Sequence, residues 1–516
     1  MSRPVRGRRI LSVELAKNLR PCGNKLIPVT RWNMSRKPVA SSATGVIVLA
    51  AGLGKRMHSA LPKVLHEIGG QPMLFHILSR VCEAAPHSSV AIVVGHDREK
   101  VEAAVRANPA YARLELAFVH QPEQKGTGHA ARCAMDSPWG KARLAAKDQI
   151  LILPGDQPLL SLALVEQMLA PLARGEAMRL LTTEIPNPTG YGRIVRRGKV
   201  GPVLRITEEK DANLRERQIH EVAVSIYTFQ AQFLVFGLQR LSNKNAQGEY
   251  YLTDLVEYAA RAKKKLDVLQ WGPHEELRGV NDPWELSIAR RLLNERCVRT
   301  WALRGARFID PSTTWVDCSV ELAKDVIVHP GANLQGTTRV EEGAIIGPHC
   351  VLKNMKIGAG AQIKTGTVGE DSFVEKGAQV GPYAHLRPET HVGAGAKIGN
   401  FVELKKARIG EKTSIAHLSY VGDAEIGKNV NIGCGFVTCN FDGRVIDGSR
   451  KHKTVIEDDA FIGSDCQVLA PIRVGKGAYI ASGSTINQDV EADALAVART
   501  RQVNKQGYAR KLKPTS

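Results

Sequence analysis

An aliphatic residue followed by glycine recurs through the second half of the chain, and this rhythm constrains the fold more than any other feature. Gly381, Gly393 and Gly399 are separated by twelve and six residues. A six-residue period is typical of a parallel β-helix, whose aliphatic side chains fill the interior while glycine helps turn a corner. The Ile-Gly or Val-Gly step occurs at Gly347, Gly358, Gly369, Gly381, Gly393, Gly399, Gly410, Gly422, Gly427, Gly433, Gly463 and Gly475.

We therefore predict a left-handed parallel β-helix of hexapeptide repeats over residues 306–500; the alternative is a Gly-rich all-β domain without regular coils. The rhythm breaks near residues 440–455, where we expect a loop to leave the coils, and breaks in a repeat array often carry function. Residues 501–516 are expected to form a loose basic tail.

The first half of the chain has a different pattern, because short apolar runs alternate with helix-like segments. Strands are predicted at 90–95, 114–119 and 149–153, with helices at 71–85 and 126–136 between them. Alternation of this kind predicts a doubly wound, Rossmann-like α/β sheet over residues 44–281. Ligands of such sheets bind beyond the C-terminal ends of the strands. A connecting helix is expected over 282–305, with Asp282 as its cap and Pro283 at its first position.

A Gly-rich turn follows the first of these strands, in the string Leu49-Ala-Ala-Gly-Leu-Gly-Lys-Arg-Met57, and Leu61-Pro-Lys63 comes soon after. Gly52 and Gly54 allow the backbone to approach a ligand closely. Arg56 and Lys63 add positive charge beside exposed N–H groups, which suits phosphate. The glycines alone fit a plain strand-to-helix turn equally well. The string is neither a dinucleotide fingerprint nor a Walker loop.

Net charge and cysteine content limit the kinds of ligand and the cellular compartment that we expect for this protein. The net charge is +20, but residues 1–44 hold ten Lys or Arg against one acidic residue, Glu14. The remaining positive charge is spread out and lacks a nucleic-acid motif, so it suits anionic small molecules better than nucleic acid. Nine scattered cysteines without a C-x-x-C pair predict reduced thiols and a cytoplasmic protein. We expect no membrane span.

The N-terminal extension, residues 1–43, allows three interpretations. It is a disordered tail, a transit peptide, or a segment absent from the native protein, which would then start at Met34. The first and third are favoured over targeting.

The string through Met57 and Lys63 is similar to the signature of sugar-phosphate nucleotidyltransferases. Further segments follow in order: Gln121 to His129, Leu153-Pro-Gly-Asp-Gln157, Thr189 to Ile194 and Gly279-Val-Asn-Asp282. Together, from about residue 44 to the end, the chain resembles the bacterial bifunctional N-acetylglucosamine-1-phosphate uridylyltransferase/glucosamine-1-phosphate acetyltransferases. The resemblance implies uridylyl transfer from UTP in the first half and acetyl transfer from acetyl-CoA in the second, which together supply a precursor of peptidoglycan and lipopolysaccharide.

For uridylyl transfer, the resemblance implies that Arg56 and Lys63 neutralise the triphosphate and that Asp156 and Asn281 hold Mg²⁺. A carboxylate with an amide oxygen suits Mg²⁺, which takes its other ligands from phosphates and water. Gln121, Gly126 and Thr127 would contact the uracil. The full set implied for UTP or the UDP-sugar is Leu49, Ala50, Gly52, Lys63, Gln121, Gly126, Thr127, Gly192, Glu208 and Asn281.

For acetyl transfer, the resemblance makes His417 the general base, and a near-neutral imidazole suits the deprotonation of the sugar amine. Arg387, Lys405 and Lys451 would bind the sugar phosphate. The other substrate residues implied are Glu403, Tyr420, Asn431 and Asn440, and the acetyl-CoA residues are Cys434, Ser464, Ser482 and Arg499. Relatives with hexapeptide repeats usually form homotrimers with sites between subunits, which we expect here.

Two departures from the family pattern affect the sugar side of the first site. Ala223 stands where the family has a sugar-binding Asn, and Pro154 replaces a usual aromatic residue. In the second half, Cys434 stands where Ala is common and Phe441 where Tyr is common.

Two further hypotheses remain. One is a single-function sugar-phosphate nucleotidyltransferase with a structural or regulatory β-helix. The other is a non-enzymatic scaffold of the kind found among translation exchange-factor subunits. The single-function hypothesis predicts that the residues for acetyl transfer have been lost. The scaffold hypothesis predicts the loss of Arg56, Lys63 and Asp156. Both sets of residues are present in the sequence.

Overall fold

The protein is described by a computed structural model that covers residues 44–198, 200–443, 445 and 448–512. The predictions for residues 1–43 and for the last residues of the basic tail, 513–516, lie outside the described residues. Within the described part, the tail contains a short 3₁₀ helix at Tyr508–Leu512.

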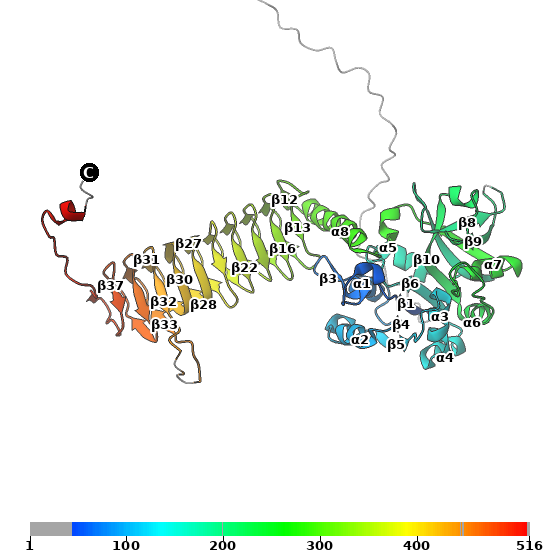
Figure 1. The fold of residues 1–516 in the computed structure, drawn as a ribbon, viewed down its shortest axis with the longest axis horizontal. Helices are drawn as coiled ribbons and strands as arrows, with labels where there is room; N and C mark the ends of the chain where they lie inside the picture. Colours follow the sequence, from blue (N-terminus) through cyan, green and yellow to red (C-terminus); the bar gives the residue numbers. More distant parts are fainter. Residues whose placement is uncertain (1–43, 199, 444, 446–447, 513–516) are drawn as a thin grey trace, which may run out of the picture. The chain divides into compact units, whose positions relative to one another are not determined.

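The first half folds as a mixed β-sheet covered by helices (Figure 1). Its strand order is β11-β7-β10-β6-β1-β4-β5, with β8 and β9 attached beside β10. The four neighbouring strands β6, β1, β4 and β5 are parallel, as predicted, whereas β10 runs antiparallel to β6 and β7. The strands are β1 (Thr44–Ala50), β4 (Ser89–Val94), β5 (Glu115–His120), β6 (Gln149–Pro154), β7 (Glu176–Glu184), β8 (Gly192–Arg196), β9 (Val203–Thr207), β10 (Glu221–Gln230) and β11 (Lys265–Gln270).

Both faces of the central strand are buried, which explains its unbroken apolar sequence. Val46 and Val48 belong to the core on one face of the sheet, and Ile47 belongs to the core on the other. The covering helices are α1 (Met73–Ala84), α2 (Arg98–Arg106), α3 (Thr127–Asp136), α4 (Pro138–Ala145), α5 (Leu162–Leu169), α6 (Ala231–Leu238) and α7 (Asp254–Arg261).

A single long helix, α8 (Pro283–Leu303), follows the sheet. Its N-cap is Asp282, whose side chain accepts a hydrogen bond from the Glu285 N–H at 2.8 Å, and Pro283 occupies the first helical position. The capping residue and the proline are those expected from the sequence.

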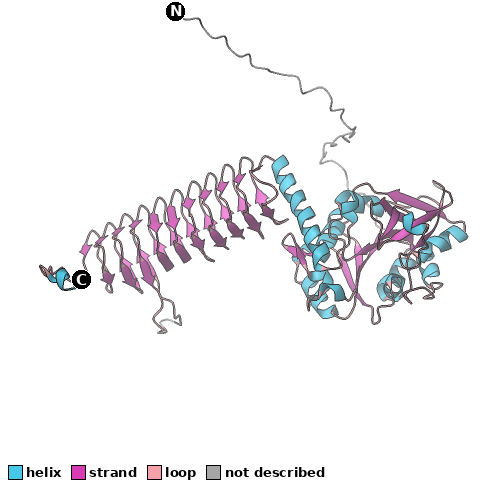
Figure 2. Cartoon of the chain, turned by 45° about the horizontal axis from the view of Figure 1, so that its top comes forward, coloured by secondary structure: helices cyan, strands magenta, loops and turns pink. Residues whose placement is uncertain are grey.

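The second half is a parallel β-helix of short strands (Figure 2), from β12 (Arg307–Phe308) to β39 (Leu495–Ala496). One coil aligns with the next at a distance of 17 or 18 residues: Val380 pairs with Ile398, and Ile398 with Ile415. These aliphatic side chains form the buried interior. Ile432 pairs with Ile462, and the longer step accommodates the loop predicted near residues 440–455.

The corner glycines are required chiefly for space. A Cβ on Gly410 would collide with the carbonyl oxygen of Gly427 on the next coil. The strands that carry candidate site residues are β25 (His385–Leu386), β27 (Lys397–Asn400), β28 (Glu403–Ile409), β29 (Ser414–His417), β30 (Tyr420–Ile426), β31 (Asn431–Ile432), β32 (Val437–Cys439), β34 (Phe461–Ile462) and β37 (Tyr479–Ile480).

Candidate functional sites

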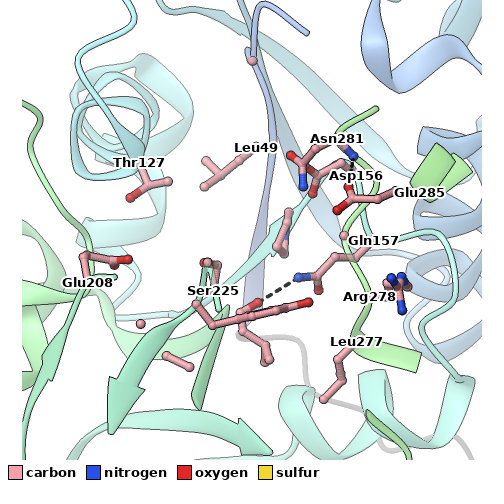
Figure 3. A pocket seen from close by; sticks show the side chains of 18 of the residues that line it. Leu49, Thr127, Asp156, Gln157, Glu208, Ser225, Leu277, Arg278, Asn281 and Glu285 are labelled. Carbon is pink, nitrogen blue, oxygen red and sulfur yellow. Dashed lines mark hydrogen bonds between the residues drawn. The ribbon is translucent and has the colours of Figure 1, made fainter. Parts of the chain in front are cut away.

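A cavity of about 930 Å³ lies beyond the carboxyl ends of β1 and β6 (Figure 3). This is where the predicted sheet topology places a ligand. The predicted residues that line it are Leu49, Gly52, Arg56, Lys63, Gln121, Gly126, Thr127, Asp156, Gly192, Glu208 and Asn281. Ala50 is not among the lining residues; it is buried in β1, with its side chain in the core.

At one end of the cavity, two side-chain oxygens surround the ammonium group of Lys63. The Lys63 ammonium lies 2.5 Å from Asp156 Oδ2 and 2.8 Å from Asn281 Oδ1. Asp156 follows β6, whereas Asn281 directly precedes the cap of α8, and the Asn281 N–H donates to Glu285 at 2.7 Å. A carboxylate and an amide oxygen therefore converge on positive charge, although they come from segments far apart in the sequence.

The Gly-rich turn forms the neighbouring wall. Gly54 adopts φ 60°, and a Cβ there would lie 2.8 Å from the Lys63 Cβ, so this position requires glycine. Gly52 faces open space, which leaves its backbone accessible to a ligand. Arg56 lines the cavity and is exposed. The turn thus presents backbone and positive charge beside Lys63.

The segment at the start of α3 forms another wall. The Gln121 side chain donates to the Gly126 carbonyl at 3.2 Å, and the Leu252 N–H donates to the Thr127 hydroxyl at 3.2 Å. Gly126 has φ 94°, and a Cβ there would lie 2.8 Å from the Tyr250 carbonyl oxygen. These contacts fix a backbone edge suited to a planar group.

The opposite end of the cavity is acidic. Glu208 accepts a hydrogen bond from Thr253 at 2.9 Å, and burial raises the pKa of its carboxyl, with Asp211 and Glu249 adding repulsion. Gly192 and Ala223 are paired in register on β8 and β10. The cavity therefore has the Lys63–Asp156 ion pair and Arg56 at one end and the Glu208 carboxyl at the other.

Several lining residues were not predicted from the sequence. Ser225 sits at a bulge in β10 with φ 59°, unusual for a residue other than glycine. Gln157 donates to the Val224 carbonyl at 3.0 Å. Gln157 belongs to the predicted segment Leu153-Pro-Gly-Asp-Gln157, so the sequence placed it close to the site. No sequence signal marks the strained backbone at Ser225. Arg278, Glu249 and Thr253 also line the cavity.

On the β-helix, His417 belongs to a column of side chains that occupy matching positions on successive coils. Asn400 pairs in register with His417, and the register of β29, β31, β34 and β37 aligns His417 with Cys434, Ser464 and Ser482. The Arg499 guanidinium donates to the Ser482 carbonyl at 2.8 Å. The predicted base and the predicted acetyl-CoA residues thus follow one corner of the β-helix.

His417 is exposed, and its ring is oriented by a neighbour. Its Nδ1 lies 2.7 Å from the Asn400 side-chain oxygen. In the tautomer that carries its proton on Nδ1, the ring donates to this oxygen and the Nε2 lone pair remains available. This is the arrangement that a general base requires.

A second group of predicted residues follows the adjoining strands. Arg387 donates to Glu403 at 2.9 Å, and Glu403 pairs in register with Tyr420. Asn440 donates to Asp423 at 2.5 Å and lies 3.4 Å from the Tyr420 hydroxyl.

A smaller cavity of about 370 Å³ is lined by Lys405, Lys451 and Asp423, among others. The Lys451 ammonium lies 4.5 Å from the centre of the Phe441 ring. Asn431 is separate from this group, because it lies on β31 and pairs with Ser414 and Phe461.

Across the described residues, no group of three or more His, Cys, Asp or Glu side chains is arranged to hold a metal. A cation bound by Asp156 and Asn281 would therefore depend on its substrate for the remaining ligands. None of the helices among the described residues is long and apolar enough to span a membrane.

Comparison with known proteins assigns a family model to each half. Residues 46–220 match the MobA-like NTP transferase domain, and residues 453–488 match the bacterial transferase hexapeptide repeats. The bifunctional protein GlmU of Streptomyces avermitilis is 43% identical over 472 residues, 91% of this chain and 95% of that protein. The bifunctional protein GlmU of Geotalea uraniireducens is 42% identical over 468 residues, 90% of this chain and 99% of that protein.

Proposed function

The chain belongs to the GlmU family of bifunctional transferases, and we propose that its two sites catalyse consecutive steps in the synthesis of UDP-N-acetylglucosamine. The β-helix, residues 306–500, transfers acetyl from acetyl-CoA to the amine of glucosamine 1-phosphate. The α/β domain, residues 44–281, then joins N-acetylglucosamine 1-phosphate to the uridylyl group of UTP and releases pyrophosphate.

In uridylyl transfer, the sugar phosphate is already a nucleophile, so the protein supplies positioning and charge. Lys63 and Arg56 stabilise the negative charge that builds up as the α-phosphorus is attacked. The Asp156 and Asn281 oxygens already surround the Lys63 ammonium, and this donor set fits Mg²⁺. Mg²⁺ bound there would neutralise phosphate charge. Gln121, Gly126 and Thr127 hold the uracil, while Gly192 and Glu208 face the sugar.

In acetyl transfer, His417 Nε2 takes the proton from the attacking amine, and Asn400 keeps the other ring nitrogen protonated. Arg387, Lys405 and Lys451 hold the sugar phosphate, with Glu403, Tyr420 and Asn440 around it. The corner that leads from Cys434 through Ser464 and Ser482 to Arg499 binds acetyl-CoA. Because His417 is exposed, we propose that a neighbouring subunit of a cytoplasmic homotrimer completes this site.

The observation that carries the proposal is the coexistence of two separate polar constellations, one around Lys63, Asp156 and Asn281 and one around His417. Two assays on the purified chain test it: pyrophosphate release from UTP and N-acetylglucosamine 1-phosphate, and CoA-thiol release from acetyl-CoA and glucosamine 1-phosphate. We expect both. Pyrophosphate release without thiol release would instead indicate a single-function nucleotidyltransferase.

A further inference from the structure

The wall of the large cavity contains a buried hydrogen-bond acceptor that no described residue satisfies. Gln157, directly after Asp156, is 6% exposed and lines the cavity. Its Nε2 donates to the Val224 carbonyl at 3.0 Å, whereas its Oε1 is buried without a hydrogen-bond partner among the described residues. Figure 3 shows this side chain reaching from beside Asp156 to the side of the cavity formed by Ser225.

The orientation of this amide is determined by its partner. Exchanging the amide oxygen and nitrogen would direct Oε1 at the Val224 carbonyl, which would bring two acceptors together. The Oε1 therefore remains the free group. A buried acceptor without a partner costs roughly 1–3 kcal/mol. Since Gln157 lines the cavity, a bound ligand is one source of the missing donor.

The surroundings of Gln157 indicate which part of the ligand this is. Asp156 and Lys63 form an ion pair on one side, beside Arg56, and this is the side where phosphate is expected. Ala223, on the strand segment that Gln157 contacts, offers only an apolar surface, and its register partner Gly192 has no side chain. The Gln157 side-chain amide therefore lies between the Lys63–Asp156 side of the cavity and the strands that carry Gly192 and Ala223. A sugar attached to phosphate carries hydroxyl groups, and an acetamido sugar also carries an N–H, all of them donors.

We propose that Gln157 Oε1 accepts a hydrogen bond from the sugar of the sugar 1-phosphate and so determines which sugar the α/β domain accepts. The proposal depends on the proposed uridylyl transfer. It assigns to Gln157 a polar contact with the sugar on the wall where Ala223 has no polar group to offer. The contact exists only when the sugar is bound, so its loss affects the sugar phosphate and leaves UTP unaffected.

The test compares Gln157→Met, which preserves length but removes the acceptor together with the donor to the Val224 carbonyl, with Gln157→Asn, which withdraws the amide by one methylene. In both variants the KM for N-acetylglucosamine 1-phosphate is expected to rise about tenfold or more, while UTP affinity, measured by calorimetry, stays within twofold. Retained UTP binding also shows that the variant is folded. Gln124→Met is the matched control, since Gln124 lines the cavity and donates to the Ala51 carbonyl at 2.6 Å but belongs to the turn side. Its KM for the sugar phosphate should change less than that of Gln157→Met.

Glucose 1-phosphate distinguishes the two donor types. If Oε1 binds the acetamido N–H, Gln157→Met loses discrimination between the two sugar phosphates; if it binds a shared hydroxyl, both KM values rise together. Either result supports the contact. Unchanged KM values for both sugar phosphates, in a variant that still binds UTP, overturn it. An inactive wild-type protein would instead refute the proposed function itself.

Discussion

The two candidate sites are built in opposite ways. The α/β site is a cavity whose walls come from segments as distant as Lys63 and Asn281, joined because strand ends and loops meet at one edge of a sheet. The β-helix site lies along a surface, where matching positions on successive coils align His417 with Cys434 and Ser464. A cavity can surround its ligand within one chain. A column of side chains on a surface can bind a ligand along its length, but it leaves the proposed general base, His417, exposed.

The largest effect that sharpens this contrast is expected from Asp156→Asn. The change removes the carboxylate that faces Lys63, so uridylyl transfer should fall by about a hundredfold or more, and extra Mg²⁺ should recover only part of it. Pyrophosphate release is measured over a Mg²⁺ titration. Thiol release from acetyl-CoA is the internal control and should be unchanged, because none of the proposed acetyl-transfer residues belongs to this cavity. A matching loss of thiol release would show that the sites are not independent.

Dilution tests whether the open site needs a second subunit. If a neighbouring chain completes the site at His417, specific acetyl-transfer activity should drop severalfold once the protein dissociates, while uridylyl transfer persists. Both activities are measured over a dilution series alongside sedimentation velocity. Acetyl transfer that remains constant in a demonstrated monomer would contradict the shared site.

The smallest effect concerns Asp254, which begins α7 directly after the cavity residue Thr253. Burial, with repulsion from Glu257 and Glu208, raises the pKa of Asp254 to about 6 from its ordinary 3.8. The folded state then binds more protons than the unfolded state between these pH values, so stability falls as pH rises through that window. Asp254→Asn should raise the melting temperature by roughly a few degrees at pH 7, and the gain should vanish below about pH 4. Calorimetry at both pH values checks this, and a gain of equal size at both would contradict it.

The sequence predicted more of the coils than of the cavity. An Ile-Gly or Val-Gly step repeats locally, and the register of a β-helix follows directly from its period, so the interior column through Ile398 and Ile415 was foreseeable. The antiparallel course of β10 was not, because nothing in its apolar sequence specifies direction. The corner glycine Gly410 was noted, but its reason, a close approach by Gly427, depends on the neighbouring coil.

The site residues divide in the same manner. Asp156 and Asn281 stand in recognisable strings at a strand end and a helix start, and the fold brings them together. Gln157 stands in one of those strings, yet its free Oε1 depends on a carbonyl 67 residues away in a bulged strand. Only the three-dimensional structure shows that contact.

The most direct measurement of the central claim, two independent sites in one chain, is a complementation assay. His417→Ala and Asp156→Ala are each supplied with glucosamine 1-phosphate, acetyl-CoA, UTP and Mg²⁺, separately and mixed, and UDP-N-acetylglucosamine is quantified. We predict almost no product from either variant alone, since removing a general base costs about 10²–10⁴ in rate, and ready formation by the mixture. If the mixture stays inactive, or if His417→Ala also stops pyrophosphate release from N-acetylglucosamine 1-phosphate, the two sites are not independent.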